Sequence, residues 1–182
     1  MIDHSREKLI NAMIFFAQNT KFCGKTKLIK LLYQLDFRHF KASGKLVTGL
    51  SYYAWELGPC PKSLWDEMTP PKETLLEIFD FPDKDLDDDA YVIKPKVGFN
   101  KDCFTKRELT LLNSLASEYE LTKAKDLIVE THLPGKPWDK TLKKKGKNAL
   151  ISPFLALDDS SESISEDEAL SIENDFKLLK KL

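Results

Sequence analysis

Two polar side chains stand three residues apart in the most apolar stretch of the chain, and their types could support chemistry. Asp36 and His39 lie within residues 27–40, where eight of the other positions are leucine, isoleucine, tyrosine or phenylalanine. Residues three apart share one face of a helix. In one interpretation Asp36 orients His39 in a catalytic or metal site. In the other, the pair is hydrogen-bonded and only organises the core, because buried polar groups are costly when they have no partner.

Two further residues could complete a reactive site. His132 could join Asp36 and His39 to bind zinc or iron, although metal motifs usually show denser ligand spacing. Cys60, on a Gly-Pro-Cys-Pro turn, could be a nucleophile activated by a histidine, but nothing like a nucleophile elbow surrounds it. We therefore favour the structural interpretation and expect no catalytic residue, no metal ligand and no cofactor.

The elements that position these residues can be predicted from periodicity and capping signals. Residues 25–42 predict a helix that is apolar around its whole circumference, and such a helix lies inside a domain. Gly44 ends it. Ser51–Leu57 predicts a strand, and Lys62–Met68 a short helix. The fold class expected is mainly α with a few short β-strands (α+β), a compact helical domain around a central buried helix.

Local signals also predict where the later helices begin. Thr105 with Glu108, and Ser165 with Glu168, have the spacing of capping boxes. Thr122 is predicted to cap a helix that ends before Pro134. The lysines between residues 140 and 147 form a basic run, which we interpret as a solvated face.

The carboxy-terminal part differs in composition from the rest. Residues 158–163 are serine-rich and acidic, which predicts a flexible linker. We expect one domain over residues 1–157, followed by an acidic linker and an amphipathic helix over residues 158–182. The apolar side chains of that helix, Ile172, Phe176 and Leu179, could pack on the core, dock on a partner or swap between protomers.

Composition excludes several classes of protein. The net charge of −1 gives no general attraction to nucleic acid or membranes, and the lysine run lacks interleaved aromatics, so nucleic acid is not an expected partner. Three widely spaced cysteines argue against a disulfide scaffold or a zinc ribbon. The amino terminus is charged and lacks a signal-peptide pattern, and no stretch approaches a membrane span. We expect a cytoplasmic protein.

Several motifs follow one another in the first third of the chain: Lys27 to Tyr33, Asp36, His39, Gly44, Thr48-Gly49, the aromatic strand Tyr52–Trp55 and Gly58-Pro59. Their order resembles the Panacea domain, the SocA-like antitoxin domain of bacteria and their phages. A second, looser similarity lies downstream, where Thr131-His132 and Pro137-Trp138 look like the family's Ser-His and Pro-Ala-Trp element.

The resemblance implies an antitoxin-like protein-binding module that neutralises a cognate toxin, encoded by the adjacent gene, without catalysis. It places Asp36, His39, His132 and Trp138 in a structural polar network. Contact with the partner is predicted for Tyr52, Trp55, Trp65, Ile172, Phe176 and Leu179, because aromatic residues are enriched in binding hot spots.

Two alternatives to this function and one question of assembly stay open. The first alternative is a metal-dependent or hydrolytic enzyme centred on Asp36, His39 and His132. The second is a phage-encoded regulator that acts on host proteins. A homo-oligomer is also compatible with the sequence.

Overall fold

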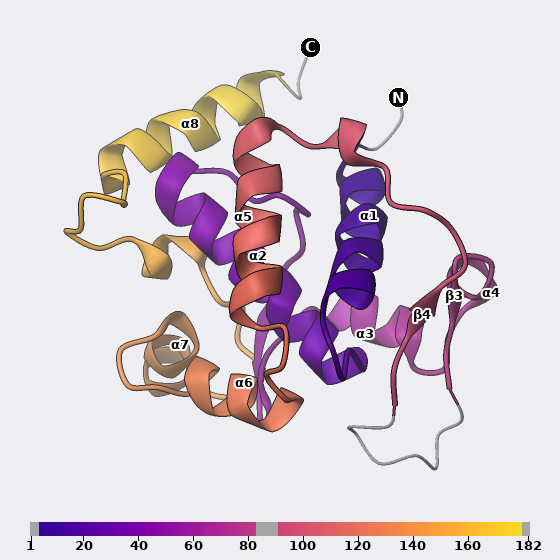
Figure 1. Cartoon of the computed structure of the whole chain (residues 1–182). Coiled ribbons are helices and arrows are strands. Elements are labelled where there is room, and N and C mark those ends of the chain that lie inside the picture. The colour runs from indigo at the N-terminus through magenta and orange to yellow at the C-terminus, as the bar shows by residue number, and fades with distance from the viewer. Residues whose placement is uncertain (1–3, 83–90, 180–182) are drawn as a thin grey trace.

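Helix α2 (Lys25–Ser43) runs through the middle of the molecule, where α1 (His4–Asn19), α5 (Lys106–Glu118) and α6 (Ala124–Thr131) pack against it (Figure 1). The computed structural model describes residues 4–82 and 91–179. The other elements are β1 (Tyr53–Trp55), β2 (Gly58–Cys60), α3 (Lys62–Met68), α4 (Glu73–Leu76), β3 (Phe79–Asp80), β4 (Lys94–Pro95), η1 (Lys101–Cys103), α7 (Pro137–Lys145), η2 (Pro153–Ala156) and α8 (Glu166–Leu179). Helices dominate and the strands are short and antiparallel, which confirms the predicted α+β fold class.

Helix α2 is buried around its whole circumference, as its sequence predicts. Leu28, Ile29 and Leu31 point in different directions, and each is at most 2% exposed. Although α2 is apolar, no helix in the described ranges is long and apolar enough to cross a lipid bilayer. The helix ends where predicted: Gly44 has a φ of 68°, and its amide donates to the Phe40 carbonyl at 2.7 Å.

Two groups of buried apolar side chains meet at α2. The larger group joins α1, α2, α3 and α5, and a fully buried leucine within it contributes roughly 1.5–3 kcal/mol. The smaller group lies between α2, β1 and α7. It consists of Tyr33, Phe37, Tyr52, Ala54, Trp138 and Ile151.

The strands form two short hairpin-like pairs. In the first pair Tyr53 is opposite Cys60 and Trp55 is opposite Gly58. Residues 148–151 cover the other edge of β1, since Ala54 donates to the Ala149 carbonyl at 2.9 Å. The predicted strand 51–57 is therefore present but shorter. The pair β3–β4 flanks the acidic connection, of which residues 83–90 lie outside the described residues.

Both predicted capping boxes are present. Glu108, at the start of α5, also accepts from Lys8 Nζ at 2.7 Å and is only 4% exposed, so this box joins α5 to α1. Ser165 and Glu168 exchange the corresponding bonds before α8. The predicted Thr122 cap is wrong, because α6 begins after Lys123 and has no side-chain cap.

Helix α7 was not predicted from the sequence. The basic run 140–147 falls largely within it, and the helix begins at Pro137, whose fixed φ suits a first helical position. Trp138 and Thr141 are buried on one side, while the lysines at positions 143–145 lie exposed on the last turn. Cations there interact favourably with the helix dipole. The basic run is therefore the solvated face of a short amphipathic helix.

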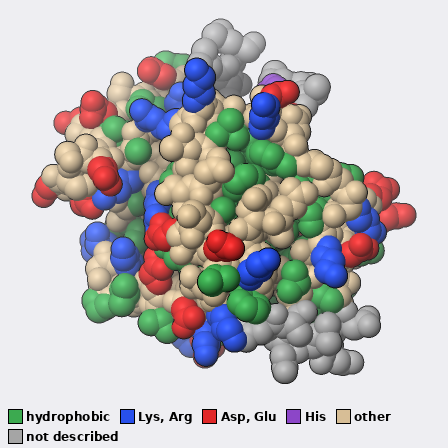
Figure 2. Space-filling model, viewed as in Figure 1, with side chains coloured by type: hydrophobic (Ala, Val, Ile, Leu, Met, Phe, Trp, Pro, Cys, Tyr) green, Lys and Arg blue, Asp and Glu red, His purple; other side chains and the backbone are tan. Residues whose placement is uncertain are grey.

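The carboxy-terminal segment folds back onto the end of α2. The Ile164 amide donates to the Lys41 carbonyl at 2.9 Å, and Lys41 Nζ lies 2.7 Å from the Asp158 carboxylate. Ala169 is fully buried above Gly44. Figure 2 shows acidic side chains gathered along the edge that α8 and the preceding segment occupy. The segment is therefore bonded to the body of the protein, and a division into two domains at residue 157 stays a prediction.

Gly44 is expected to be essential for this packing. A Cβ atom there would lie 3.0 Å from the terminal carbons of Ile164 and Ile172, and the backbone is left-handed. Gly44→Ala should lower the free energy of unfolding by about 1–2 kcal/mol in urea denaturation. The matched control is Gly98→Ala, whose Cβ would meet nothing within 4 Å. We expect the control to leave stability unchanged or raise it by less than about 1 kcal/mol; an equal loss in both variants would contradict the prediction.

Candidate functional site

The carboxylate of Asp36 is the most completely bonded polar group of α2. One oxygen accepts from the backbone amides of Val47 and Thr48, each at 2.8 Å. The other accepts from the Tyr52 hydroxyl at 2.9 Å and from the Thr48 hydroxyl. A carboxylate offers about four acceptor positions. All of them are used here, so Asp36 anchors the segment after α2 and has no position left for a metal or a substrate.

Burial and hydrogen bonding act on this carboxyl in opposite directions. Asp36 is fully buried, which raises the pKa of its carboxyl to about 6, while the four donors lower it. Tyr52 is bound to the same charge, and burial together with Asp36 raises the pKa of its phenol. Both groups therefore belong to the core of the protein.

His39 is bonded to a different part of the same segment. Its Nδ1 lies 2.7 Å from the Lys45 carbonyl and 3.1 Å from the Ser43 hydroxyl. A carbonyl only accepts, so Nδ1 carries the proton. Asp36 and His39 are not hydrogen-bonded to each other among the described bonds, and the predicted direct pair is wrong. Each side chain instead fixes the chain that follows α2.

The imidazole of His132 belongs to a third arrangement, at the end of α6. It stacks on Trp138 with 3.9 Å between ring centroids and 21° between planes. The Trp138 indole donates to the Trp55 carbonyl at 2.9 Å, which joins α7 to β1. His132 Nε2 is buried and has no hydrogen-bond partner. The four residues predicted as one polar network therefore divide into separate groups around Asp36, His39 and His132.

Lys30 lies close to His132 and is almost completely buried. Its exposed fraction is 2%, and its Nζ donates to the Pro59 carbonyl at 2.9 Å. Burial lowers the pKa of Lys30 to about 7. Burial also raises the pKa of the neighbouring Cys60 thiol to about 11, so Cys60 is neutral and a poor nucleophile at physiological pH.

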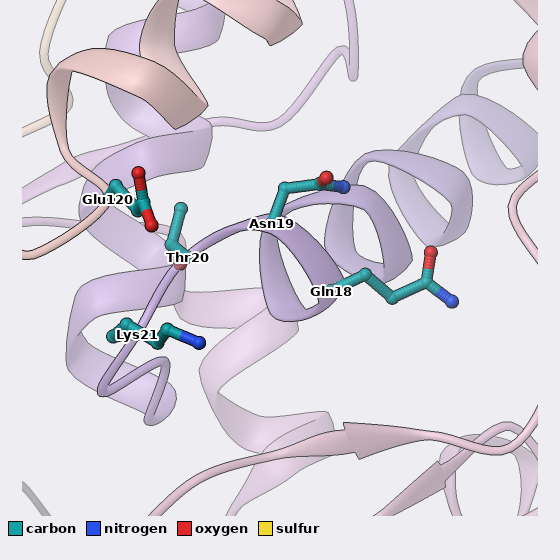
Figure 3. A pocket seen from close by; sticks show the side chains of 5 residues that line it. All are labelled: Gln18, Asn19, Thr20, Lys21 and Glu120. Carbon is teal, nitrogen blue, oxygen red and sulfur yellow. The ribbon is translucent and has the colours of Figure 1, made fainter.

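Lys27 is fully buried one turn earlier on α2 and holds three backbone carbonyls. Its Nζ donates to Lys21 O at 2.6 Å, Tyr119 O at 2.8 Å and Glu120 O at 3.2 Å. An ammonium has three N–H donors, so every one of them is used. Lys27 thereby joins the α1–α2 connection to the end of α5. Beside this point lies a hollow lined by polar side chains (Figure 3), namely Gln18, Asn19, Thr20, Lys21 and Glu120.

Lys27 and Lys30 were assigned no role from the sequence, although both belong to the family motif. The signal was present: two lysines three residues apart within a helix that is apolar all round. Fully buried lysines are rare unless they are paired. A helix predicted to be buried on all sides therefore implies bonded partners for any lysine that it contains.

The residues predicted to contact a partner differ in accessibility. Tyr52 is 1% exposed and bonded to Asp36, so it is excluded from a contact surface. Trp55 and Trp65 are half-buried and meet edge to face with 6.0 Å between centroids. In α8, Ile172 faces Gly44, whereas Phe176 is 53% exposed. The side chain of Leu179 lies outside the described residues.

The residues of the alternative metal site, which the sequence did not favour, have separate surroundings. Asp36, His39 and His132 each contact different partners, as described above. Within the described ranges no group of three or more histidine, cysteine, aspartate or glutamate side chains is arranged to hold a metal ion.

Comparison with known families assigns the chain to a family. Residues 28–139, well over half of the chain, match the family described as "Antitoxin SocA-like, Panacea domain". The matched range begins within α2, includes β1 and β2, and ends in α7. The chain belongs to the SocA-like antitoxin family, and this membership supports an antitoxin-type role. Comparisons with curated proteins and with solved structures gave no match.

Substitutions of Asp36 and of its partner Tyr52 are predicted to lower stability by different amounts. Asp36→Asn replaces a carboxylate that accepts four hydrogen bonds by an amide, whose NH2 group would face the same hydrogen-bond donors. The substitution should lower the free energy of unfolding by roughly 2–4 kcal/mol. Tyr52→Phe removes one donor only and should cost about 1 kcal/mol. Urea denaturation of both variants measures the difference. An Asp36→Asn loss no greater than that of Tyr52→Phe would show that the carboxylate does not organise this segment.

The same centre predicts a pH dependence of stability. The pKa of the Asp36 carboxyl is about 6 in the folded state against 3.8 for an ordinary aspartate. Between these values the folded state binds more protons, so the contribution of Asp36 to the free energy of unfolding falls as pH rises through this window. The stability difference between wild type and Asp36→Asn should therefore shrink between about pH 3.5 and about pH 7. A constant difference would contradict the raised pKa.

Proposed function

We propose that this protein neutralises a partner toxin by binding it directly and covering or distorting the toxin's active site. The observation that carries the proposal is membership in the SocA-like antitoxin family over residues 28–139. The proposed role is non-catalytic. Support comes from Asp36, whose acceptor positions are all used inside the protein, and from the separate surroundings of Asp36, His39 and His132.

The turn of the β1–β2 hairpin is the contact surface that the described residues favour. Leu57 in the turn is 61% exposed, and the Trp55–Trp65 pair lies beside it. Across the hairpin, Gly58 approaches His132, and the next residue, Leu133, is 45% exposed. Exposed apolar side chains grouped in this way are typical of protein interaction sites. Loops held by a rigid scaffold commonly carry such sites.

We propose that the toxin is encoded by the gene beside this one and that the pair acts in the cytoplasm. All three cysteines, at positions 23, 60 and 103, are free thiols, which suits a reducing compartment. Helix α8 is a second proposed contact region through Phe176, which is 53% exposed. Self-association of the chain stays a prediction.

Co-expression tests the proposed function. We expect the product of the adjacent gene to arrest growth when expressed alone, to be harmless together with this chain, and to co-purify with it. If the neighbouring product is harmless alone, or the two proteins do not associate, the proposed function is wrong.

Variants of the hairpin turn then test the proposed surface. Leu57→Glu places a charge in the apolar patch and should weaken co-purification at least about tenfold, because a desolvated charge without a partner costs well over 1.4 kcal/mol. The matched control is Leu76→Glu, since Leu76 is 42% exposed on α4, away from the hairpin. Equal effects of the two substitutions would exclude the turn as the contact site.

A further inference from the structure

Two groups that can each gain a positive charge lie beneath the β1–β2 hairpin. Lys30 Nζ has three N–H bonds when protonated, but among the residues that the structure describes it donates to one acceptor only, the Pro59 carbonyl. His132 Nε2 is buried without a partner. A Cβ atom on Gly58 would lie 2.8 Å from Lys30 Nζ and 3.2 Å from His132 Nε2, so both nitrogens approach the same point of the hairpin backbone.

No neighbouring element supplies a charge that balances these two groups. From β2, Cys60 presents a neutral thiol, and from α3 the exposed Asp66 acts on Cys60. From α6, Thr131 presents a hydroxyl that donates to the Ile128 carbonyl, and from α7 the Trp138 ring covers the imidazole. In the described parts of the chain, neither Lys30 nor His132 forms an ion pair with a carboxylate. Lys27 differs, because three carbonyls surround its ammonium.

Burial therefore favours the neutral forms of both groups. Burial lowers the pKa of Lys30 to about 7, and burial together with the nearby Lys30 lowers the pKa of His132. When the pH falls below neutral, protonation of one of these groups places a desolvated cation under the hairpin. Protonation of the other group adds a second cation, and the two cations repel each other. Lys30 Nζ lies next to Gly58 and is almost completely buried, so separation of the hairpin from α2 would bring it to water, whereas the half-buried His132 ring is also covered by Trp138.

We propose that protonation of Lys30 and His132 loosens the β1–β2 hairpin, which thus acts as a proton-sensitive latch. The neutral state keeps three contacts: the Lys30 bond to the Pro59 carbonyl, the Trp138 bond to the Trp55 carbonyl and the stack of His132 on Trp138. The latch is independent of the proposed function. If the hairpin turn does contact a toxin, acidification weakens that contact.

The tryptophans of the chain report on this latch directly. All three, Trp55, Trp65 and Trp138, lie at the hairpin or against it. We would measure quenching of their fluorescence by acrylamide in the full chain between about pH 8 and about pH 5.5. We expect the quenching constant to rise about twofold toward acid while far-UV circular dichroism stays constant, because only a local segment opens. Equal quenching at both pH values, or loss of helix content together with the rise, would overturn the latch.

Substitutions distinguish the latch from a general effect of acid. Lys30→Met removes the buried amine and should largely abolish the rise in quenching, and Lys30→Met with His132→Gln should abolish it completely. His132→Gln alone retains Lys30 and should roughly halve the rise, which provides a test if Lys30→Met does not fold. The matched control is His39→Gln, which removes a buried histidine near the other end of α2 and should keep the full rise. A full rise in His132→Gln, or none in His39→Gln, would contradict the assignment.

Discussion

Four polar side chains of helix α2 are buried and cannot be solvated without disrupting the fold. Lys27, Lys30, Asp36 and His39 are each at most 6% exposed. A buried polar group without a partner costs about 1–3 kcal/mol, and a charged one costs more. Each of these side chains is therefore bonded, and in each case its partners include backbone atoms outside the helix. The helix consequently positions the connecting segments around it, in addition to supplying apolar surface.

The buried polar side chains along α2 differ in how many of their hydrogen-bond donors and acceptors are used. Asp36 uses four acceptor positions, and Lys27 uses three donors. Within residues 4–82 and 91–179, Lys30 uses only one donor, and the nearby His132 Nε2 has no partner. The segment after α2 is thus held by a carboxylate whose hydrogen-bond acceptor positions are all used. The hairpin over Lys30 lies on groups whose hydrogen-bonding capacity is only partly used. Local opening is easiest where few buried contacts hold a segment, and the exposed Leu57 belongs to that hairpin.

The parts of this structure that could be predicted from sequence are those decided by local interactions. The end of α2 at Gly44 and the capping box of Thr105 with Glu108 depend on residues within one helical turn. The burial of α2 followed from its all-round apolar pattern. Helix α7 was not predicted because a run of lysines is typical of a solvated segment, whereas the packing of Trp138 against β1 depends on residues far away in the sequence.

The bonds of the candidate site could not be predicted in the same way. Asp36 is bonded to residues 11 to 16 positions later, and no local spacing indicates that the chain returns to it. The expected pair with His39 relied on helical spacing alone. Spacing places two side chains on one face, but it does not decide between a bond to each other and a bond to a third segment.

The residues that carry the family resemblance lie largely in the interior of this chain. The positions that carry the resemblance include Lys27, Lys30, Asp36 and Gly58, and all of them are buried or bonded to the backbone. They specify how the hairpin and the helices are arranged. An exposed side chain such as Leu57, by contrast, can change with little effect on stability. The family motif therefore describes the scaffold, and the hairpin-turn side chains proposed to contact a partner are not among its buried positions.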